Sequence, residues 1–200
     1  MVKPQFVKEL RREDKAEQVF ETNVVNPKIA SEENKIDLIK QSAYYVDEDK
    51  KGPLLRYLIK HNNMQQGLVF TSSTYKADNV ADKLRKNGID ASAIHSKKSQ
   101  SARTDALRNF KNGGLRVLVA TDLLARGIDI EFLPIVINYE LPRSPKDYIH
   151  RIGRTGRADN PGDAITIVTP EDEHHFKIIQ KKMKKWVDRV ACDNLDLKDY

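Results

Sequence analysis

Three arginines spaced three residues apart form the densest group of chemically useful side chains in this sequence. Arg151, Arg154 and Arg157 belong to the segment His-Arg-Ile-Gly-Arg-Thr-Gly-Arg over 150–157. This spacing places side chains on one face of a helical backbone, and guanidinium groups can bind phosphate oxygens in pairs. The two glycines between them would let the backbone approach a ligand closely. The segment predicts a phosphate site. The alternative is a solvated basic helix end, in which two glycines would cost stability without structural return.

Three other segments each join an apolar run to a polar stretch. They read Leu-Val-Phe-Thr-Ser-Ser-Thr over 68–74, Ile-His-Ser-Lys-Lys-Ser-Gln-Ser-Ala-Arg over 94–103, and Val-Leu-Val-Ala-Thr-Asp-Leu-Leu-Ala-Arg-Gly-Ile-Asp over 117–129. An apolar strand that opens into a polar loop is typical of the end of a parallel sheet, where ligands usually bind.

In this order and at these spacings, the four segments resemble motif IV, the Gln-x-x-Arg motif, motif V and motif VI of DEAD-box RNA helicases. The resemblance is to the second RecA-like domain of that family and covers about residues 36–185. Each motif alone is a weak signal, and the four in register make a strong one. General likeness suggests the bacterial RhlE-like subgroup.

The resemblance implies an ATP-dependent RNA helicase that couples ATP hydrolysis to unwinding or remodelling of RNA duplexes. Arg154 and Arg157 match the family's arginine fingers, which cross an interdomain cleft to the γ-phosphate as charge builds in the transition state. Asp129 matches the carboxylate that hydrogen-bonds the ATP ribose, although it could equally be an ordinary turn residue. Arg126 and Gly127 match the same interdomain patch. ATP with Mg is therefore expected, with the metal held by a first domain.

The same resemblance implies an RNA groove and a coupling site. His150 and Arg151 match residues that contact the other domain and neighbouring motifs, although His150 could simply cap or pack. The positions that hold the RNA sugar–phosphate backbone in the family match Ser72, Ser73, Gln100, Arg103, Thr121 and Asp122. Such contacts do not depend on base sequence. Ser73 could also be a helix N-cap, and Gln100 a polar residue at a helix start.

The sequence departs from the family pattern after the motif histidine, where glycine is common and Ser96 follows His95. We expect Ser96 to perturb one backbone contact with RNA. His95 is interpreted as a structural loop histidine and not as a catalytic base.

Two nucleotide-binding motifs of the family do not occur in the sequence. These are the Gly-x-x-x-x-Gly-Lys-Ser/Thr loop and the Asp-Glu-Ala-Asp tetrad, which the family keeps in its first domain. The chain thus resembles the C-terminal half of a helicase, cut near the domain boundary, and should be inactive alone. Two alternatives are a stand-alone RNA-binding or adaptor module and a DNA-directed superfamily 2 helicase. His150 argues against the latter, because such relatives more often have glutamine there.

The composition fits a polyanion partner without proving one. The formal net charge is +6, the single cysteine excludes an internal disulfide and a cysteine-rich metal site, and no 18-residue apolar run exists. We expect a cytoplasmic protein with no resident metal and no membrane contact.

Strands alternate with amphipathic helices from about residue 42, which predicts an α/β fold with a RecA-like, mostly parallel sheet sandwiched by helices. Strands are expected at 42–46, 68–71, 91–94, 117–120, 135–138 and 164–168. The final helix is expected from 169, with a core stripe that ends at Trp186. The predicted domains are 1–34, a remnant of a first domain or a linker; 35–188, the RecA-like domain; and 189–200, a tail.

Overall fold

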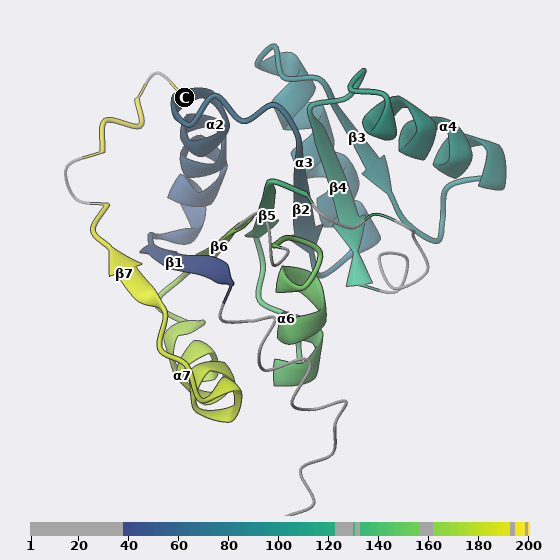
Figure 1. Cartoon of the computed structure of the whole chain (residues 1–200). Helices are drawn as coiled ribbons and strands as arrows, with labels where there is room; N and C mark the ends of the chain where they lie inside the picture. The colour runs from purple at the N-terminus through teal and green to yellow at the C-terminus, as the bar shows by residue number, and fades with distance from the viewer. Residues whose placement is uncertain (1–37, 123–129, 131–132, 157–161, 193–194, 199) are drawn as a thin grey trace, which may run out of the picture.

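The computed structural model describes residues 38–122, 130, 133–156, 162–192, 195–198 and 200 (Figure 1). Within these residues lies one seven-stranded sheet in which every strand pair is parallel, in the order β3-β4-β2-β5-β6-β1-β7. The strands are β1 Ile39–Tyr45, β2 Gly67–Thr71, β3 Ala91–Ile94, β4 Val117–Thr121, β5 Ile135–Asn138, β6 Gly162–Val168 and β7 Asp188–Val190. The predicted fold class is confirmed.

Helices cover both faces of the sheet. They are a short 3-10 turn η1 (Glu48–Lys50), α2 (Lys51–His61), α3 (Thr74–Lys86), α4 (Gln100–Lys111), α6 (Pro145–Ile152) and α7 (Glu173–Met183). Buried side chains of α2 and α3 pack on one face, and those of α4, α6 and α7 pack on the other. Parallel crossover connections place helices in this way and bury the strands on both sides.

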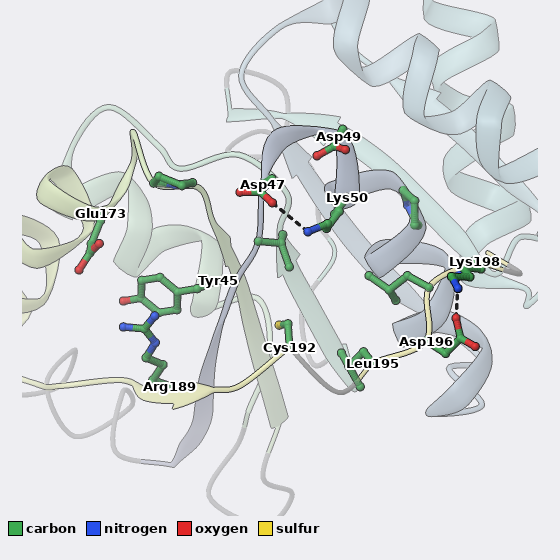
Figure 2. Close-up of a pocket in the computed structure, with 14 residues that line it drawn as sticks. Tyr45, Asp47, Asp49, Lys50, Glu173, Arg189, Cys192, Leu195, Asp196 and Lys198 are labelled. Atoms are coloured by element: carbon green, nitrogen blue, oxygen red, sulfur yellow. Dashed lines mark hydrogen bonds and ion pairs between the residues drawn. The ribbon is translucent and has the colours of Figure 1, made fainter.

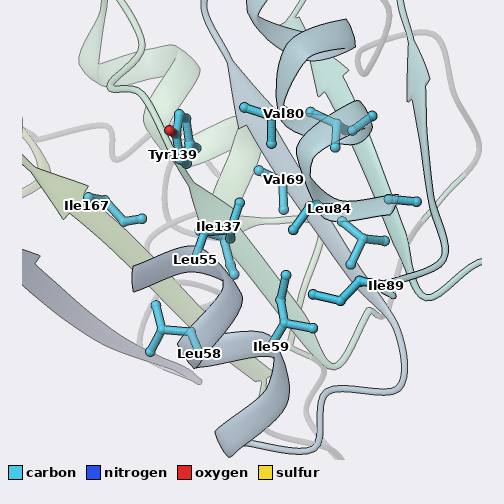
Figure 3. Packing of buried hydrophobic residues seen from close by; sticks show 14 of the residues in the cluster. Leu55, Leu58, Ile59, Val69, Val80, Leu84, Ile89, Ile137, Tyr139 and Ile167 are labelled. Carbon is cyan, nitrogen blue, oxygen red and sulfur yellow. The ribbon is translucent and has the colours of Figure 1, made fainter. Parts of the chain in front are cut away.

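Successive side chains of β2 pack against the helices on opposite faces of the sheet. Val69 points into the cluster formed with α2 and α3, beside Leu55 and Val80 (Figure 3). Its neighbours Leu68 and Phe70 belong to the opposite cluster. Because side chains alternate along a strand, a strand buried on both faces reads as a continuous apolar run.

Serine caps fix where three helices begin. The Oγ atoms of Ser73, Ser99 and Ser144 accept hydrogen bonds from the backbone N–H groups three residues further on. These bonds satisfy donors that the first helical turn leaves open. The capping role considered for Ser73 is therefore confirmed.

The prediction that Trp186 belongs to the core stripe of the final helix is wrong. Trp186 is 67% exposed, because α7 ends at Met183 and Lys184 adopts a left-handed conformation with φ 56°. The helical stripe cannot continue past that turn, so the indole lies outside the core.

The C-terminal segment runs back along the edge of the sheet. β7 pairs with β1, and the Arg189 guanidinium lies 4.1 Å from the centroid of the Tyr45 ring. A hollow of about 680 Å³ lies between this segment and the turn after β1. Figure 2 shows the side chains that line it. None of the predicted site residues that the structure describes lines this hollow. No helix within the described residues is long and apolar enough to cross a membrane.

Candidate functional site at the carboxyl edge of the sheet

Parallel strands all end at the same edge of a sheet, here called the carboxyl edge. Ser72 and Ser73 follow β2, the segment 95–103 follows β3, and Thr121 and Asp122 end and follow β4. These three strands are neighbours in the order β3-β4-β2. The residues expected to touch RNA therefore come from adjacent strands at one edge, the usual place for a ligand site in such folds.

Arg151 is the structural centre of this edge. Its side chain is 2% exposed, its Nε donates to Asp122 Oδ1 at 2.5 Å, and its Nη2 donates to Asp122 Oδ2 at 2.8 Å. Its Nη1 donates to the Glu140 carbonyl oxygen at 2.6 Å and to Asn138 Oδ1 at 3.2 Å. The guanidinium also lies 4.9 Å from the Phe70 ring centroid. Arg151 thus contacts strands β2 and β5 and the residues that follow β4 and β5.

The expectation that Arg151 and Arg154 line one face of a helix is wrong. α6 ends at Ile152 and Gly153 caps it, so Arg154 lies in the turn beyond the helix. The Arg154 side chain is partly exposed, and its carbonyl oxygen accepts from the Leu133 N–H at 3.0 Å. Packing turned one arginine inward and left the other near the surface. His150, in the last turn of α6, is exposed.

Gly156 allows close backbone packing within the domain, whereas the close approach to a ligand expected of Gly153 and Gly156 stays a prediction. The φ of Gly156 is +75°, and a Cβ there would lie 2.9 Å from Ile39 Cγ1. Other residues would be strained in this conformation. Arg157, Arg126, Gly127 and Asp129 lie outside the described residues, so the nucleotide contacts expected of them stay predictions.

Ser72 is held by a residue that the sequence analysis missed. Its backbone N–H and its hydroxyl both donate to Glu140 Oε2, at 2.7 and 2.8 Å. Lys76 Nζ lies 3.9 Å from Glu140 Oε1 and 3.0 Å from Glu48 Oε1. The signal that could have revealed Glu140 is its position two residues after Asn138, as the first charged side chain beyond the apolar strand β5.

Charge pairing shifts the pKa values around Lys76. The hydrogen bond to Glu48 raises the pKa of Lys76 against the opposing effect of burial. Burial acts to raise the pKa of Glu48, but the hydrogen bond from Lys76 and the charge of Lys51 outweigh it, and the pKa is lowered. Both groups are therefore charged near neutral pH and brace the start of α3.

The remaining expected RNA contacts differ in accessibility. Gln100 is exposed, and its Oε1 accepts from Arg103 Nη2 at 2.5 Å across the first turn of α4. Thr121 is only 8% exposed, so it offers little surface to a ligand. Asp122 is partly exposed, but both carboxylate oxygens accept from Arg151.

His95 is buried and structural, as interpreted. Its Nε2 lies 3.0 Å from Asp78 Oδ2, and Lys98 Nζ lies 2.8 Å from Asp78 Oδ1. Burial acts to raise the pKa of Asp78, but the hydrogen bonds from Lys98 and His95 lower it overall. Asp78 therefore ties the loop after β3 to α3. No group of side chains in the described residues could hold a metal ion.

Comparison with known proteins identifies the family of this chain. The family described as "Helicase conserved C-terminal domain" matches residues 50–159. The DEAD-box ATP-dependent RNA helicase CshA of Bacillus licheniformis is 37% identical over 177 residues, which are 88% of this chain and 36% of CshA. The probable ATP-dependent RNA helicase ddx49 of Dictyostelium discoideum is 38% identical over 176 residues, 88% of this chain and 33% of that protein. The chain thus spans about a third of these relatives' length.

Solved structures give the same result. A DEAD box protein from the hyperthermophile Methanococcus jannaschii superposes with a TM-score of 0.73 at 40% identity, covering 77% of this chain and 42% of that one. The C-terminal domain of the DEAD-box protein Dbp5 superposes with a TM-score of 0.74 at 32% identity, covering 82% and 96%. The S. cerevisiae Dbp5 bound to RNA and ADP BeF3 also matches, with a TM-score of 0.73 at 32% identity over 82% of this chain and 44% of that one.

The fold and the edge define a RecA-like helicase domain. The chain belongs to the DEAD-box RNA helicase family, as its C-terminal RecA-like domain. The resemblance drawn from the four motifs is confirmed, while the RhlE-like subgroup stays a prediction.

Proposed function

We propose that this chain is the C-terminal half of an ATP-dependent RNA helicase that couples ATP hydrolysis to RNA duplex unwinding or remodelling. The observation that carries the proposal is the convergence of the helicase motifs at the carboxyl edge. Arg151 of motif VI and Asp122 of motif V form a bidentate pair, and Arg151 also holds the segment that positions Ser72 of motif IV. Motifs that must act together are thus mechanically joined.

On the nucleotide side, the chain contributes arginines and the first RecA-like domain contributes the phosphate cradle and the metal. Arg154 and Arg157 would stabilise the charge that develops on the γ-phosphate, and Asp129, Arg126 and Gly127 would complete the nucleotide contacts. Arg154 fits this role because it is partly exposed and follows the anchored residue Arg151 by three positions. ATP with Mg supplies the phosphoryl group whose transfer to water drives the cycle.

An arginine supplied by a second domain acts only when the two domains close on ATP. His150 is exposed next to buried Arg151, which suits contact with the first domain. Closure would also bring the two halves of the RNA groove together, so RNA binding and hydrolysis would favour the same closed state.

On the RNA side, Ser72, Ser73, Gln100 and Arg103 offer small polar groups and one guanidinium at the carboxyl edge. Such groups suit phosphates and ribose hydroxyls, so binding should be indifferent to base sequence. The solved complex of S. cerevisiae Dbp5 with RNA and ADP BeF3 supports the proposal through a related chain.

The test is RNA-stimulated ATP hydrolysis and duplex unwinding by the full-length protein that contains this chain. We expect hydrolysis to rise on addition of single-stranded RNA and an RNA duplex to be separated only when ATP is present. Hydrolysis that responds to DNA and not to RNA would favour the DNA-directed alternative. RNA binding without any hydrolysis would favour the adaptor module.

A further inference from the structure

The hydroxyl of Ser72 has a fixed direction. A serine carries one O–H donor and two acceptor lone pairs, and its backbone carries one N–H donor. Both donors of Ser72 go to the same atom, Glu140 Oε2, at 2.8 Å from Oγ and 2.7 Å from the backbone nitrogen. What the exposed Ser72 side chain still offers to a ligand is the pair of acceptor lone pairs on Oγ.

Ser73 has the opposite arrangement. Its Oγ accepts from the Lys76 N–H at 3.1 Å as the N-cap of α3, so its own O–H remains to donate. The start of a 13-residue helix also favours negative charge through its dipole and its open N–H groups. Ser73 therefore suits a phosphate oxygen, which only accepts.

An acceptor at Ser72 cannot bind a phosphate oxygen in this way, but it can bind a hydroxyl. Along a nucleic acid backbone, the group that donates is the ribose 2′-hydroxyl, and DNA lacks it. Glu140 is only 20% exposed and has Lys76 3.9 Å from its other oxygen, so it is built into the edge. Its backbone carbonyl also accepts from buried Arg151.

We propose that Glu140 makes Ser72 an acceptor for a ribose 2′-hydroxyl, so that this pair selects RNA over DNA in the groove. The inference rests on the proposed RNA groove and assigns the chemical feature that one of its positions reads. Glu140 is a positioning residue, since it acts through Ser72. Ser73 beside it serves the phosphate, which RNA and DNA share.

The test is binding of the 200-residue chain, at low salt, to labelled single strands of one base sequence made as RNA, DNA and 2′-fluoro RNA. The 2′-fluoro strand keeps the RNA-like sugar but has no O–H donor. We expect the wild-type chain to prefer RNA over both other strands by about fivefold, the size of one neutral hydrogen bond. Fluorescence anisotropy gives the dissociation constants.

Four substitutions identify the residues responsible. Ser72→Ala and Glu140→Ala should each remove most of the preference, and the double variant should lose no more than either, because the two residues act as one unit. Glu140→Gln should retain the preference, since the two Ser72 donors select the amide oxygen. Ser73→Gly, which largely keeps the helix cap, should weaken binding to all three strands by a similar factor.

The outcomes separate this inference from the proposed function. A wild-type chain that binds no strand contradicts the groove, and the inference with it. A chain that binds RNA without preferring it, or that keeps its preference in Glu140→Ala, overturns the inference alone. If Glu140→Ala lowers the melting temperature, the other two variants decide. A Ser72→Ala chain that still prefers RNA over DNA overturns the inference, and so does a Glu140→Gln chain that has lost this preference.

Discussion

Arg151 and Asp122 are 29 residues apart in the sequence and form a bidentate ion pair, with both carboxylate oxygens within 2.8 Å of guanidinium nitrogens. The arginine is buried, while the aspartate lies at the carboxyl edge. The pair fixes the end of α6 against the end of β4. Arg154, the proposed arginine finger, follows three residues later, so the backbone that leads to it is held in place by this pair.

Removing the guanidinium should destabilise the domain strongly. Arg151→Ala would leave the partly exposed Asp122 carboxylate and the Glu140 carbonyl oxygen without their donor. Water can reach the carboxylate in part, so the expected cost is about 2–3 kcal/mol, that of charge-assisted hydrogen bonds, and not the larger cost of breaking a fully buried pair. Urea unfolding of the 200-residue chain measures the free energy. The control is Arg108→Ala, because the Arg108–Asp105 pair is exposed and should contribute about 1 kcal/mol or less. A loss of that small size in Arg151→Ala would contradict the anchoring role.

Replacing the finger arginines should abolish turnover without unfolding the protein. Arg154→Lys and Arg157→Lys in the full-length protein should each lower RNA-stimulated ATP hydrolysis by about 10³-fold, because an ammonium group cannot reproduce the planar fork. Melting temperature should stay near wild type. Arg143→Lys makes the same chemical change at an exposed position before α6 and should leave the rate unaltered. Near-normal rates in both finger variants would refute the assignment.

RNA binding by the isolated chain should be weak, salt-sensitive and independent of base sequence. Arg103→Ala should weaken binding to unrelated single strands by about the same factor and lower the salt dependence, since one phosphate contact is lost. Arg108→Ala removes an equal charge from the same helix, farther from the carboxyl edge, and should have a smaller effect. A loss confined to one RNA sequence would argue against a backbone contact. The same chain should show no RNA-stimulated ATP hydrolysis.

Alkaline pH should destabilise the fold through two tyrosines. Burial raises the pKa of Tyr148 and of Tyr139 to about 12, from the ordinary value of 10.0. Above about pH 10 the unfolded chain releases these protons while the folded chain keeps them, so the free energy of unfolding falls as pH rises from about 10 to 12. Below about pH 10 this contribution is fully present.

Tyr148→Phe tests the alkaline effect, because it removes one of the two titrating groups. At about pH 8 neither tyrosine titrates, so the difference in the free energy of unfolding between the two proteins reports the lost contacts of the hydroxyl with Thr166 and Gln41. The value at about pH 8 is the reference for each protein. Between that pH and about pH 11 the variant should lose less stability than wild type. An equal loss in both proteins would show that Tyr148 does not contribute.

Trp186 should contribute little to stability. It is the chain's single tryptophan and lies beyond the end of α7, so Trp186→Ala should change the free energy of unfolding by about 0.5 kcal/mol or less. Phe176→Ala on the buried face of α7 is the matched comparison and should cost about 3–5 kcal/mol. Comparable losses would place the indole in the core after all.

Local patterns in the sequence determined most of the fold. The strands at 91–94 and 135–138 have the predicted bounds, and α6 begins where Ser144 is followed by Pro145, a local start signal for a helix. Apolar runs, caps and turn residues act over a few positions, so their effect can be read without knowing the partners. The four motifs in register were enough to indicate the family.

Only the tertiary structure decided how the motif side chains are used. Arg151 and Arg154 are both arginines of one motif, yet packing against β4 and β5 buried the first, while the end of α6 left the second partly exposed. Glu140 and Ser72 are 68 residues apart and meet because β2 and β5 are neighbours in the sheet. Strand order depends on the burial of the whole sheet and not on any local signal. The direction of the Ser72 hydroxyl, and with it the proposed choice of RNA over DNA, follows from that order.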